Sequence, residues 1–406
     1  MKKIFPKVFS NLNFLYLWFA QITSQIGLNA LYFVLTLKVY EITKKNTAVS
    51  ILILCFTLPS IIFGYLAGVY VDQLNLKRVL LFTNLLRSVV LVFLILFLGQ
   101  TYFVFLAVVA LAIATTFFVP AEGSAIPAIV EEKQLISANS LFSLTLQLSL
   151  IIGFLAGGFA LKLVGEDYTL FAILFLFIFS FVLNLLLPKN IQSESRVSHT
   201  SLMQNFFEGI IFIFKNKIVR DSIFFLTLTT TIFFILATIG PGYVDKILNL
   251  DVRYASAVVI APAVVGMVVG SFFLSNFGER FTERSLINTG LLGLGVTFLL
   301  LAFLDRGSVG RVLQITSLFL IFVLGIGNAL VTIPVTTSFQ KNTPEGLRGR
   351  AYGLLSTFIS GVAALPVLLS GAIGDLFGVR SVLLTLGLVV FTFGIYRLRP
   401  RRAKSF

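Results

Sequence analysis

Three ionisable side chains lie within or at the edge of long apolar stretches, in which acidic and basic residues are otherwise rare. They are Arg87, Glu122 and Asp375. A charged group in hydrocarbon costs about 2.5–3.5 kcal/mol on insertion scales, so such residues usually face a solute path or a partner group. They are candidates for coupling an ion to transport or for closing a gate. The alternative is an interfacial position, in which Arg87 snorkels to the membrane surface and both carboxylates sit at helix ends.

Neutral polar side chains also recur inside the apolar stretches. On a helix, positions i, i+4 and i+8 share one face. Such residues either line a path for a polar solute or hydrogen-bond one helix to the next. The candidates for cavity lining are Gln21, Gln25, Asn29, Gln147, Asn328 and Thr332.

The elements that must position these residues are twelve apolar stretches of about 20 residues. Each is long enough to cross a hydrocarbon core of about 30 Å as a helix. The 406 residues are 57% hydrophobic and only 12% charged, which predicts an all-α membrane protein. The predicted helices cover residues 13–37, 47–71, 77–99, 102–121, 137–163, 168–187, 219–243, 253–276, 284–304, 311–339, 350–373 and 379–397.

Charge and composition exclude several other functions. The net charge of +14 does not indicate nucleic-acid binding, because the basic residues sit in short connections between spans. A lone cysteine, Cys55, and a lone histidine, His199, offer no disulfide framework and no metal site. The chain has no phosphate-binding loop and no supported pair of nucleophile and base, so we expect neither a cofactor nor enzymatic activity.

The basic residues also predict the orientation in the membrane. They divide 21 to nine between the connections on the two sides, with Arg87 inside a span. By the positive-inside bias, both termini are expected to be cytoplasmic, with the basic tail after residue 397 near anionic lipid headgroups. We expect a multi-pass protein of the cell membrane, most simply a bacterial plasma membrane, that works as a monomer.

Internal similarity indicates two related halves. Pro120 and Ser124 recur 214 residues later as Pro334 and Ser338. Repeated halves around a shared site are common in transporters. We predict a six-helix bundle over residues 1–188, a cytoplasmic linker over 189–217, and a second six-helix bundle with a basic tail over 218–406. Apolar residues at steps of four from residue 202 to 214 predict an amphipathic surface helix in the linker.

A short motif joins the second and third predicted helices. Gly68 is followed by Asp72, then by Lys77 and Arg78. An aspartate at a helix C-terminus faces the negative end of the helix dipole, so Asp72 needs an external partner. A neighbouring helix N-terminus or the guanidinium of Arg78 would serve, and Gly68 lies one turn back on the same face, where it permits close approach.

This motif resembles the signature loop of the major facilitator superfamily, whose plan of six plus six helices matches the chain from end to end. The resemblance implies that Asp72 docks on the N-terminal end of the eleventh helix, near Arg348 and Arg350, and locks the cytoplasmic gate. The chain departs from the usual pattern at Gln73 and Asn75. The alternative is a solvated loop with ordinary interfacial charges.

Two further stretches resemble exporters of that superfamily. Gly153, Gly157 and Gly158 are similar to the antiporter pattern in the fifth helix, although Phe154 replaces its proline, and glycines at this spacing also suit tight helix packing. Residues 120–141 resemble the loop between helices 4 and 5 in the branch of the enterobactin exporter and macrolide efflux pumps.

The resemblance therefore implies a secondary transporter that works by alternating access. We expect proton-coupled efflux of a small amphiphilic compound such as a drug, a macrolide or a siderophore-like molecule. A uniporter or a lysophospholipid-type lipid transporter is the alternative, and a receptor or scaffold without transport is a third hypothesis. The partners expected are a small-molecule substrate, protons and membrane lipids.

Overall fold

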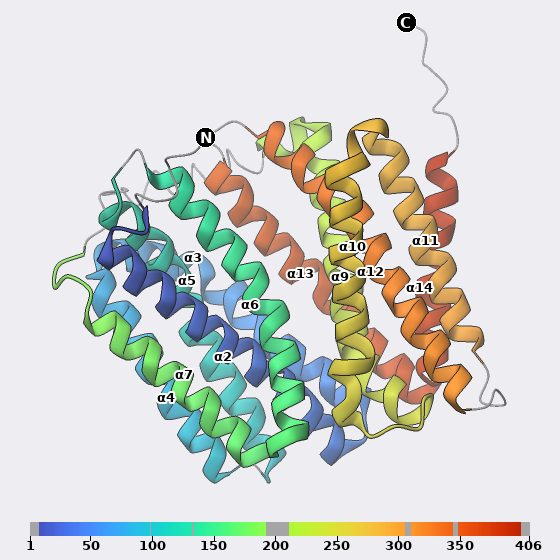
Figure 1. Cartoon of the computed structure of the whole chain (residues 1–406), viewed down its shortest axis with the longest axis horizontal. Helices are drawn as coiled ribbons and strands as arrows, with labels where there is room; N and C mark the ends of the chain where they lie inside the picture. Colours follow the sequence, from blue (N-terminus) through green and yellow to red (C-terminus); the bar gives the residue numbers. More distant parts are fainter. Residues whose placement is uncertain are drawn as a thin grey trace, which may run out of the picture. The chain divides into compact units, whose positions relative to one another are not determined.

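A computed structural model describes residues 8–97, 99–131, 134–191, 211–304, 310–343 and 348–398 (Figure 1). Within these ranges, twelve helices are long and apolar enough to cross a membrane. Large apolar side chains such as Phe82 and Phe272 lie exposed on their outer surfaces, with 66% and 71% of their area accessible. Lipid is the solvent that such surfaces require, so the chain is an all-α membrane protein.

The first six spans match the predicted positions closely at most ends. They are α2 (Leu12–Thr43), α3 (Asn46–Gln73), α4 (Leu76–Leu96), α5 (Thr101–Ile129), α6 (Leu135–Val164) and α7 (Glu166–Leu185). Asn75 begins α4 as its N-cap, because its side-chain oxygen accepts the Arg78 backbone N–H. Gly165 turns the chain from α6 into α7 with a φ of 86°, a positive value that glycine adopts readily because it has no Cβ atom.

The second six spans follow the same rules. They comprise α9 (Lys217–Lys246), the 3-10 turn η2 (Val252–Tyr254), the π-helix η3 (Ser256–Ile260) leading into α10 (Ala261–Phe277), η4 (Gly278–Arg280), α11 (Glu283–Phe303), α12 (Gly310–Lys341), α13 (Arg348–Leu376) and α14 (Val379–Leu398). Asn216 and Thr282 cap α9 and α11 through their side-chain oxygens. Gly378, with a φ of 85°, separates α13 from α14.

The chain divides into two compact units, which correspond to the two halves of the sequence except at residues 43–51. Unit 1 comprises Met1–Ile42 and Leu52–Gln204, and unit 2 comprises Thr43–Ile51 and Asn205–Phe406. The first residues of α3 therefore belong to unit 2, whereas the rest of that helix belongs to unit 1. In unit 1, α4 packs against α5 and α7; in unit 2, α11 packs against α14 and α12, and α13 packs against α9.

One boundary expectation was wrong, with consequences for a candidate site residue. The fourth span was expected to end at residue 121, and residues 120–141 were likened to the loop between helices 4 and 5. Instead α5 continues through Pro120 and Pro127 to Ile129. Proline is tolerated in a transmembrane helix because neighbouring helices and local adjustment satisfy the freed carbonyl. Glu122 consequently lies inside the helix.

The linker between the halves is only partly described. Residues 211–215 are helical, and residues 192–210, which include most of the predicted amphipathic helix, lie outside the described ranges. The basic tail beyond residue 398 also lies outside them.

Candidate functional site

Arg87 lies in the interior of unit 1, where α4 faces α2 and α5. Its side chain has no exposed area. One guanidinium nitrogen donates to the Ser24 hydroxyl at 2.5 Å and another to the Thr115 hydroxyl at 3.0 Å. The guanidinium carbon lies 4.3 Å from the centre of the Phe118 ring, a cation–π distance. These partners hold the Arg87 side chain inside unit 1, which does not favour the alternative in which it snorkels to the membrane surface.

Glu122 is the acidic counterpart of Arg87 in the same unit. Its side chain is 4% exposed. The two groups interact electrostatically but do not form a salt bridge, and Glu122 Oε1 has no hydrogen-bond partner among the described residues. Glu122 lies within α5 rather than after the expected end of that span, and its side chain is buried among helices of unit 1. Unit 1 thus holds a basic and an acidic group inside its helices, which the sequence alone did not bring together.

Hydroxyl and amide groups surround this charge pair. Ser24 donates to Asn84 Oδ1 at 3.0 Å, and Thr115 also donates to the Leu111 carbonyl at 2.8 Å. Tyr32 is within electrostatic range of Arg87. Sequence reasoning missed Ser24, Asn84, Thr115 and Tyr32. The signal that could have found the first three is a small polar residue in the middle of each of three neighbouring spans, α2, α4 and α5.

Asp375, the third ionisable candidate, caps the start of α3 from outside that helix. One carboxylate oxygen accepts the Asn46 backbone N–H at 2.7 Å and its side-chain amide at 3.0 Å. The other accepts the Thr47 backbone N–H at 2.8 Å and its hydroxyl at 2.6 Å. We call Asp375 with Asn46 and Thr47 the Asp375 cap; all three residues belong to unit 2.

The physical rule applied to Asp72 from the sequence is satisfied at Asp375. Asp375 stands next to the C-terminal residue of α13, where the helix dipole disfavours a negative charge. The N-terminus of α3 compensates, because its first N–H groups have no partner within their own helix and favour an anion. The sequence placed Asp375 at a helix end but gave no sign of this partner 329 residues away.

Close backbone approach completes the attachment of the first residues of α3 to unit 2. A Cβ atom at Gly371 of α13 would lie 2.8 Å from the Asn46 carbonyl oxygen and would also overlap the Ser50 hydroxyl. A Cβ atom at Gly242 of α9 would overlap the Asn46 side chain. The two glycines are therefore needed for this packing, since any side chain would push α3 away.

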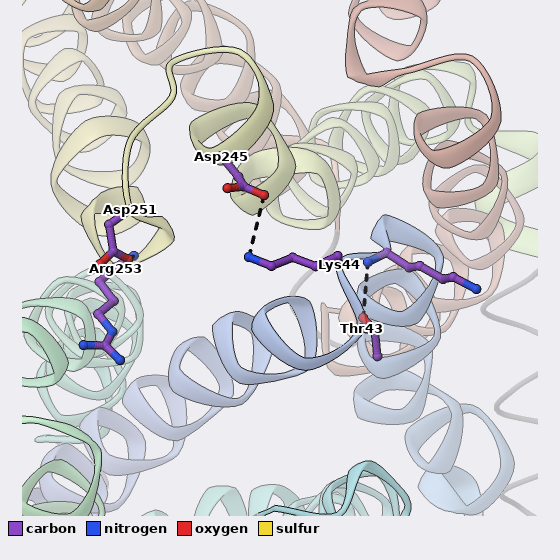
Figure 2. A network of polar contacts seen from close by, with 6 residues as sticks. Thr43, Lys44, Asp245, Asp251 and Arg253 are labelled. Atoms are coloured by element: carbon purple, nitrogen blue, oxygen red, sulfur yellow. Dashed lines mark hydrogen bonds and ion pairs between the residues drawn. The ribbon is translucent and has the colours of Figure 1, made fainter.

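An ion pair adds a weaker contact at the same place. Lys44 Nζ lies 3.8 Å from Asp245 Oδ2 at the end of α9, as Figure 2 shows. The Lys44 backbone has a φ of 54°, in the left-handed region, in the turn between α2 and α3. Both side chains keep contact with solvent, so this pair contributes at most about 1 kcal/mol. The Asp375 cap is the stronger of the two.

The polar stripe of α2 is used for helix contacts rather than left open. Gln21 is fully buried; its amide donates to the Phe142 carbonyl of α6 at 3.2 Å, and its oxygen accepts the Thr145 hydroxyl at 2.8 Å. Asn29 donates to the Gln25 carbonyl at 2.8 Å. The Gln21 bonds join α2 to α6, which favours a helix-joining role for that residue, whereas the Asn29 bond stays within α2.

The polar pair of α12 lies differently. Asn328 borders a cavity of unit 2, and its oxygen accepts the Thr332 hydroxyl at 3.1 Å. The structure describes the backbone of Gln147, in α6, but not its side chain.

The glycines of the exporter-like motif pack α6 onto α2. A Cβ atom at Gly153 would lie 2.8 Å from the Ile26 carbonyl oxygen, and one at Gly157 would lie 2.9 Å from that of Ala30. Gly158 is buried beside them. The interpretation as packing residues is therefore supported for Gly153 and Gly157.

The signature loop is described only in part. Gly68 and Asp72 lie in α3, and Arg348 and Arg350 lie in the first turn of α13, but the structure describes only the backbone of Asp72, Arg348 and Arg350. The proposed docking of Asp72 thus stays a prediction.

The rest of that loop is attached to the end of α7. Lys77 Nζ donates to the carbonyls of Leu185 and Leu187 at 2.7 and 2.5 Å, and Asn75 donates to the Lys189 carbonyl at 2.9 Å. Arg78 is exposed. A cation at the C-terminal end of α7 is favoured by the helix dipole.

Comparison with known proteins agrees with the class that the twelve spans define, a polytopic membrane protein. The profile of the Major Facilitator Superfamily matches residues 17–365 and 223–405. The chain belongs to the major facilitator superfamily.

Two relatives illustrate its place in that family. The MFS-type transporter YfmI of Bacillus subtilis (strain 168) is 25% identical over 396 residues, covering 93% of this chain and 94% of its own. The multidrug efflux pump Tap of Mycolicibacterium fortuitum is 24% identical over 363 residues, covering 85% of each.

Solved structures share the fold at low identity. The nucleoside transporter NupG superposes with a TM-score of 0.72 at 16% identity, over 96% of this chain and 100% of its own. A bacterial homologue of the lysosomal transporter Spinster gives a TM-score of 0.71 at 14% identity, over 95% of each chain.

Proposed function

We propose that this chain is a proton-coupled exporter of small amphiphilic compounds. The observation that carries the proposal is the buried pair of Arg87 and Glu122 inside unit 1. A secondary transporter driven by protons needs an ionisable group within its spans that gains and loses a proton during the cycle. Glu122 has the chemistry for that role, and Oε1 has no partner among the described residues.

Arg87 gives Glu122 a partner charge that is held in place. Because its guanidinium bonds to Ser24 and Thr115 and stacks on Phe118, it stays fixed while the carboxyl changes charge. The negative carboxylate is stabilised by Arg87, and the neutral form is the one suited to an apolar interior. We infer that the proton bound at Glu122 determines which state of the transporter is favoured.

The direction of transport is inferred from likeness. The relative Tap is a multidrug efflux pump, and residues 120–141 resemble the exporter branch of the family. With the predicted orientation, in which both termini are cytoplasmic, export in this proposal moves the compound out of the cytoplasm across a bacterial plasma membrane.

We further propose that the Asp375 cap forms and breaks during the cycle. The first residues of α3 lie in unit 2 while the remainder of that helix lies in unit 1, so a change in the course of α3 during the cycle would strain this attachment. Four hydrogen bonds to one charged carboxylate make a strong attachment. Because they share one side chain, we expect them to form and break together. Asp375 is thus a gate residue in this proposal, and Glu122 is the coupling residue.

The test is uphill transport in reconstituted vesicles. Purified protein is placed in proteoliposomes with an acidic lumen, and accumulation of ethidium and of erythromycin is followed with and without collapse of the pH gradient. We expect accumulation that needs the gradient, and at least a tenfold lower rate for Glu122→Gln. Glu131→Gln, an exposed acidic residue just after α5, is the matched control and should match the unmodified protein.

Two results would count against the proposal. Gradient-dependent accumulation that Glu122→Gln leaves unchanged would remove Glu122 as the coupling residue. Equilibration of both probes without any effect of the gradient would favour uniport instead.

A further inference from the structure

Unit 2 contains an apolar cavity that lies entirely among its own helices. It is partly open and has a volume of about 90 Å³, and its walls come from α9, η3, α10, α11, α12 and α14. Phe298, Leu294 and Leu324 form its buried side, and Val264 and Met267 of α10 form another wall. None of its lining residues is charged. Apolar walls of this kind favour apolar guests.

Two features of the backbone keep this space open. Gly266 of α10 and Gly325 of α12 lie so close that a Cβ atom on either would overlap a carbonyl oxygen of the other helix. Just before α10, the π-helix η3 places the Ala261 N–H on the Ser256 carbonyl, five residues back. The close crossing holds α10 against α12 at Gly266 and Gly325. Val259 and Ile260 of the π-helix η3 line the cavity. π-Helical segments often mark functional sites.

The cavity has a single side chain with an open hydrogen-bond donor. The Tyr243 hydroxyl is used, because it bonds to the Ser317 hydroxyl at 2.8 Å. The Asn328 oxygen is also used, because it accepts the Thr332 hydroxyl. The Asn328 amide nitrogen makes no hydrogen bond with the described residues. An apolar pocket with one convergent polar group is the usual form of a site for an organic ligand.

We propose that this cavity binds an uncharged apolar group that carries a hydrogen-bond acceptor, with the acceptor oxygen at the Asn328 amide. A ring or a branched alkyl group bearing a carbonyl or ether oxygen has this chemistry. Charged groups are excluded, since the walls offer them no counter-charge. The cavity thus receives the apolar part of the exported compound, and this role in transport rests on the proposed function, whereas the binding itself does not.

Binding is tested with two matched probes on the full chain in lipid nanodiscs. The probes are 4-fluoroacetophenone and 4-fluoroethylbenzene, which share a ring and differ by the carbonyl oxygen, and fluorine NMR titration measures binding against empty nanodiscs as the blank. We expect the ketone to bind about three- to tenfold more tightly, the worth of one hydrogen bond. Asn328→Leu should abolish this preference, and Thr332→Val, which removes only the bond within α12, should keep it.

Filling the cavity supplies the second arm. Val264→Phe places a ring in the cavity and should weaken both probes at least tenfold. Val265→Phe makes the same change at the next residue, which is 53% exposed and does not line the cavity, and should bind both probes like the unmodified protein. Ile260→Phe, at another wall, replaces Val264→Phe if that variant does not fold.

The outcomes separate the cavity from the transport proposal. If Val264→Phe and Val265→Phe bind the probes alike, the probes are in lipid rather than in the cavity, and the inference is overturned. If Asn328→Leu keeps the preference for the ketone, the ligand's acceptor oxygen does not bind the Asn328 amide, and that part of the inference is wrong. Normal probe binding together with no transport of ethidium or erythromycin would leave the cavity in place and remove the proposed function.

Discussion

At the scale of single residues, the structure changes the meaning of the three ionisable candidates. Sequence reasoning identified Arg87, Glu122 and Asp375 because charge is rare in the spans, and their roles stay predictions. Their surroundings were not predictable, because helix periodicity says which face a residue occupies but not which helix faces it. Arg87 meets Ser24 and Thr115, and Asp375 meets Asn46, across separations of 63, 28 and 329 residues.

The interaction between Arg87 and Glu122 is testable by a double-mutant cycle. Arg87→Met leaves Glu122 inside unit 1 without its partner charge, and Glu122→Gln leaves Arg87 likewise. Removing one member of a buried pair costs about 3–5 kcal/mol when the charges are in contact, and these groups are further apart, so we expect about 1–3 kcal/mol for Arg87→Met.

Measured by reversible denaturant unfolding in detergent, the double variant should be more stable than the sum of the single effects predicts, by about 0.5–3 kcal/mol. Glu131→Gln combined with Arg87→Met is the control, and its effects should add. Simple additivity for Arg87 with Glu122 would show that the two groups do not interact.

At the scale of elements, α3 is the unusual helix because its two ends belong to different units. The sequence predicted the helix nearly to the residue, at 47–71 against the observed Asn46–Gln73. It also predicted eleven other spans, since apolar length is set by the membrane itself. It did not predict that α5 passes through Pro120 and Pro127, because proline ends helices in water and only the surrounding helices make it tolerable here.

The attachment of α3 to unit 2 predicts a contrast between two glycines of α13. Gly371→Ala would place a methyl group against Asn46 and Ser50, whereas a Cβ atom at Gly361 would meet nothing within 4 Å. Overpacking of this kind costs about 1–3 kcal/mol. Hydrogen–deuterium exchange of the peptide from residue 43 to 51 should therefore be roughly tenfold faster in Gly371→Ala and unchanged in Gly361→Ala. Equal exchange in both variants would contradict the close packing at the Asp375 cap.

At the scale of the whole molecule, membership of the major facilitator superfamily accounts for the twelve spans and the paired halves. The sequence was sufficient to predict the family, because a motif such as Gly68 with Asp72, Lys77 and Arg78 is recognised from the residues alone, without the contacts they make. It was insufficient for the cavity of unit 2, which depends on the crossing of α10 and α12 and on the π-helix before α10. Neither feature has a periodic signal.

The central claim is that export of an amphiphilic compound and movement of protons are one coupled process. It is tested most directly by recording both fluxes at once in proteoliposomes that start with an ethidium gradient and no pH gradient, with entrapped pyranine reporting the lumenal pH. The account predicts that ethidium moving down its gradient drives protons in the opposite direction, and that Glu122→Gln passes ethidium with no change in the pyranine signal. Ethidium movement by the unmodified protein with a constant lumenal pH would contradict it.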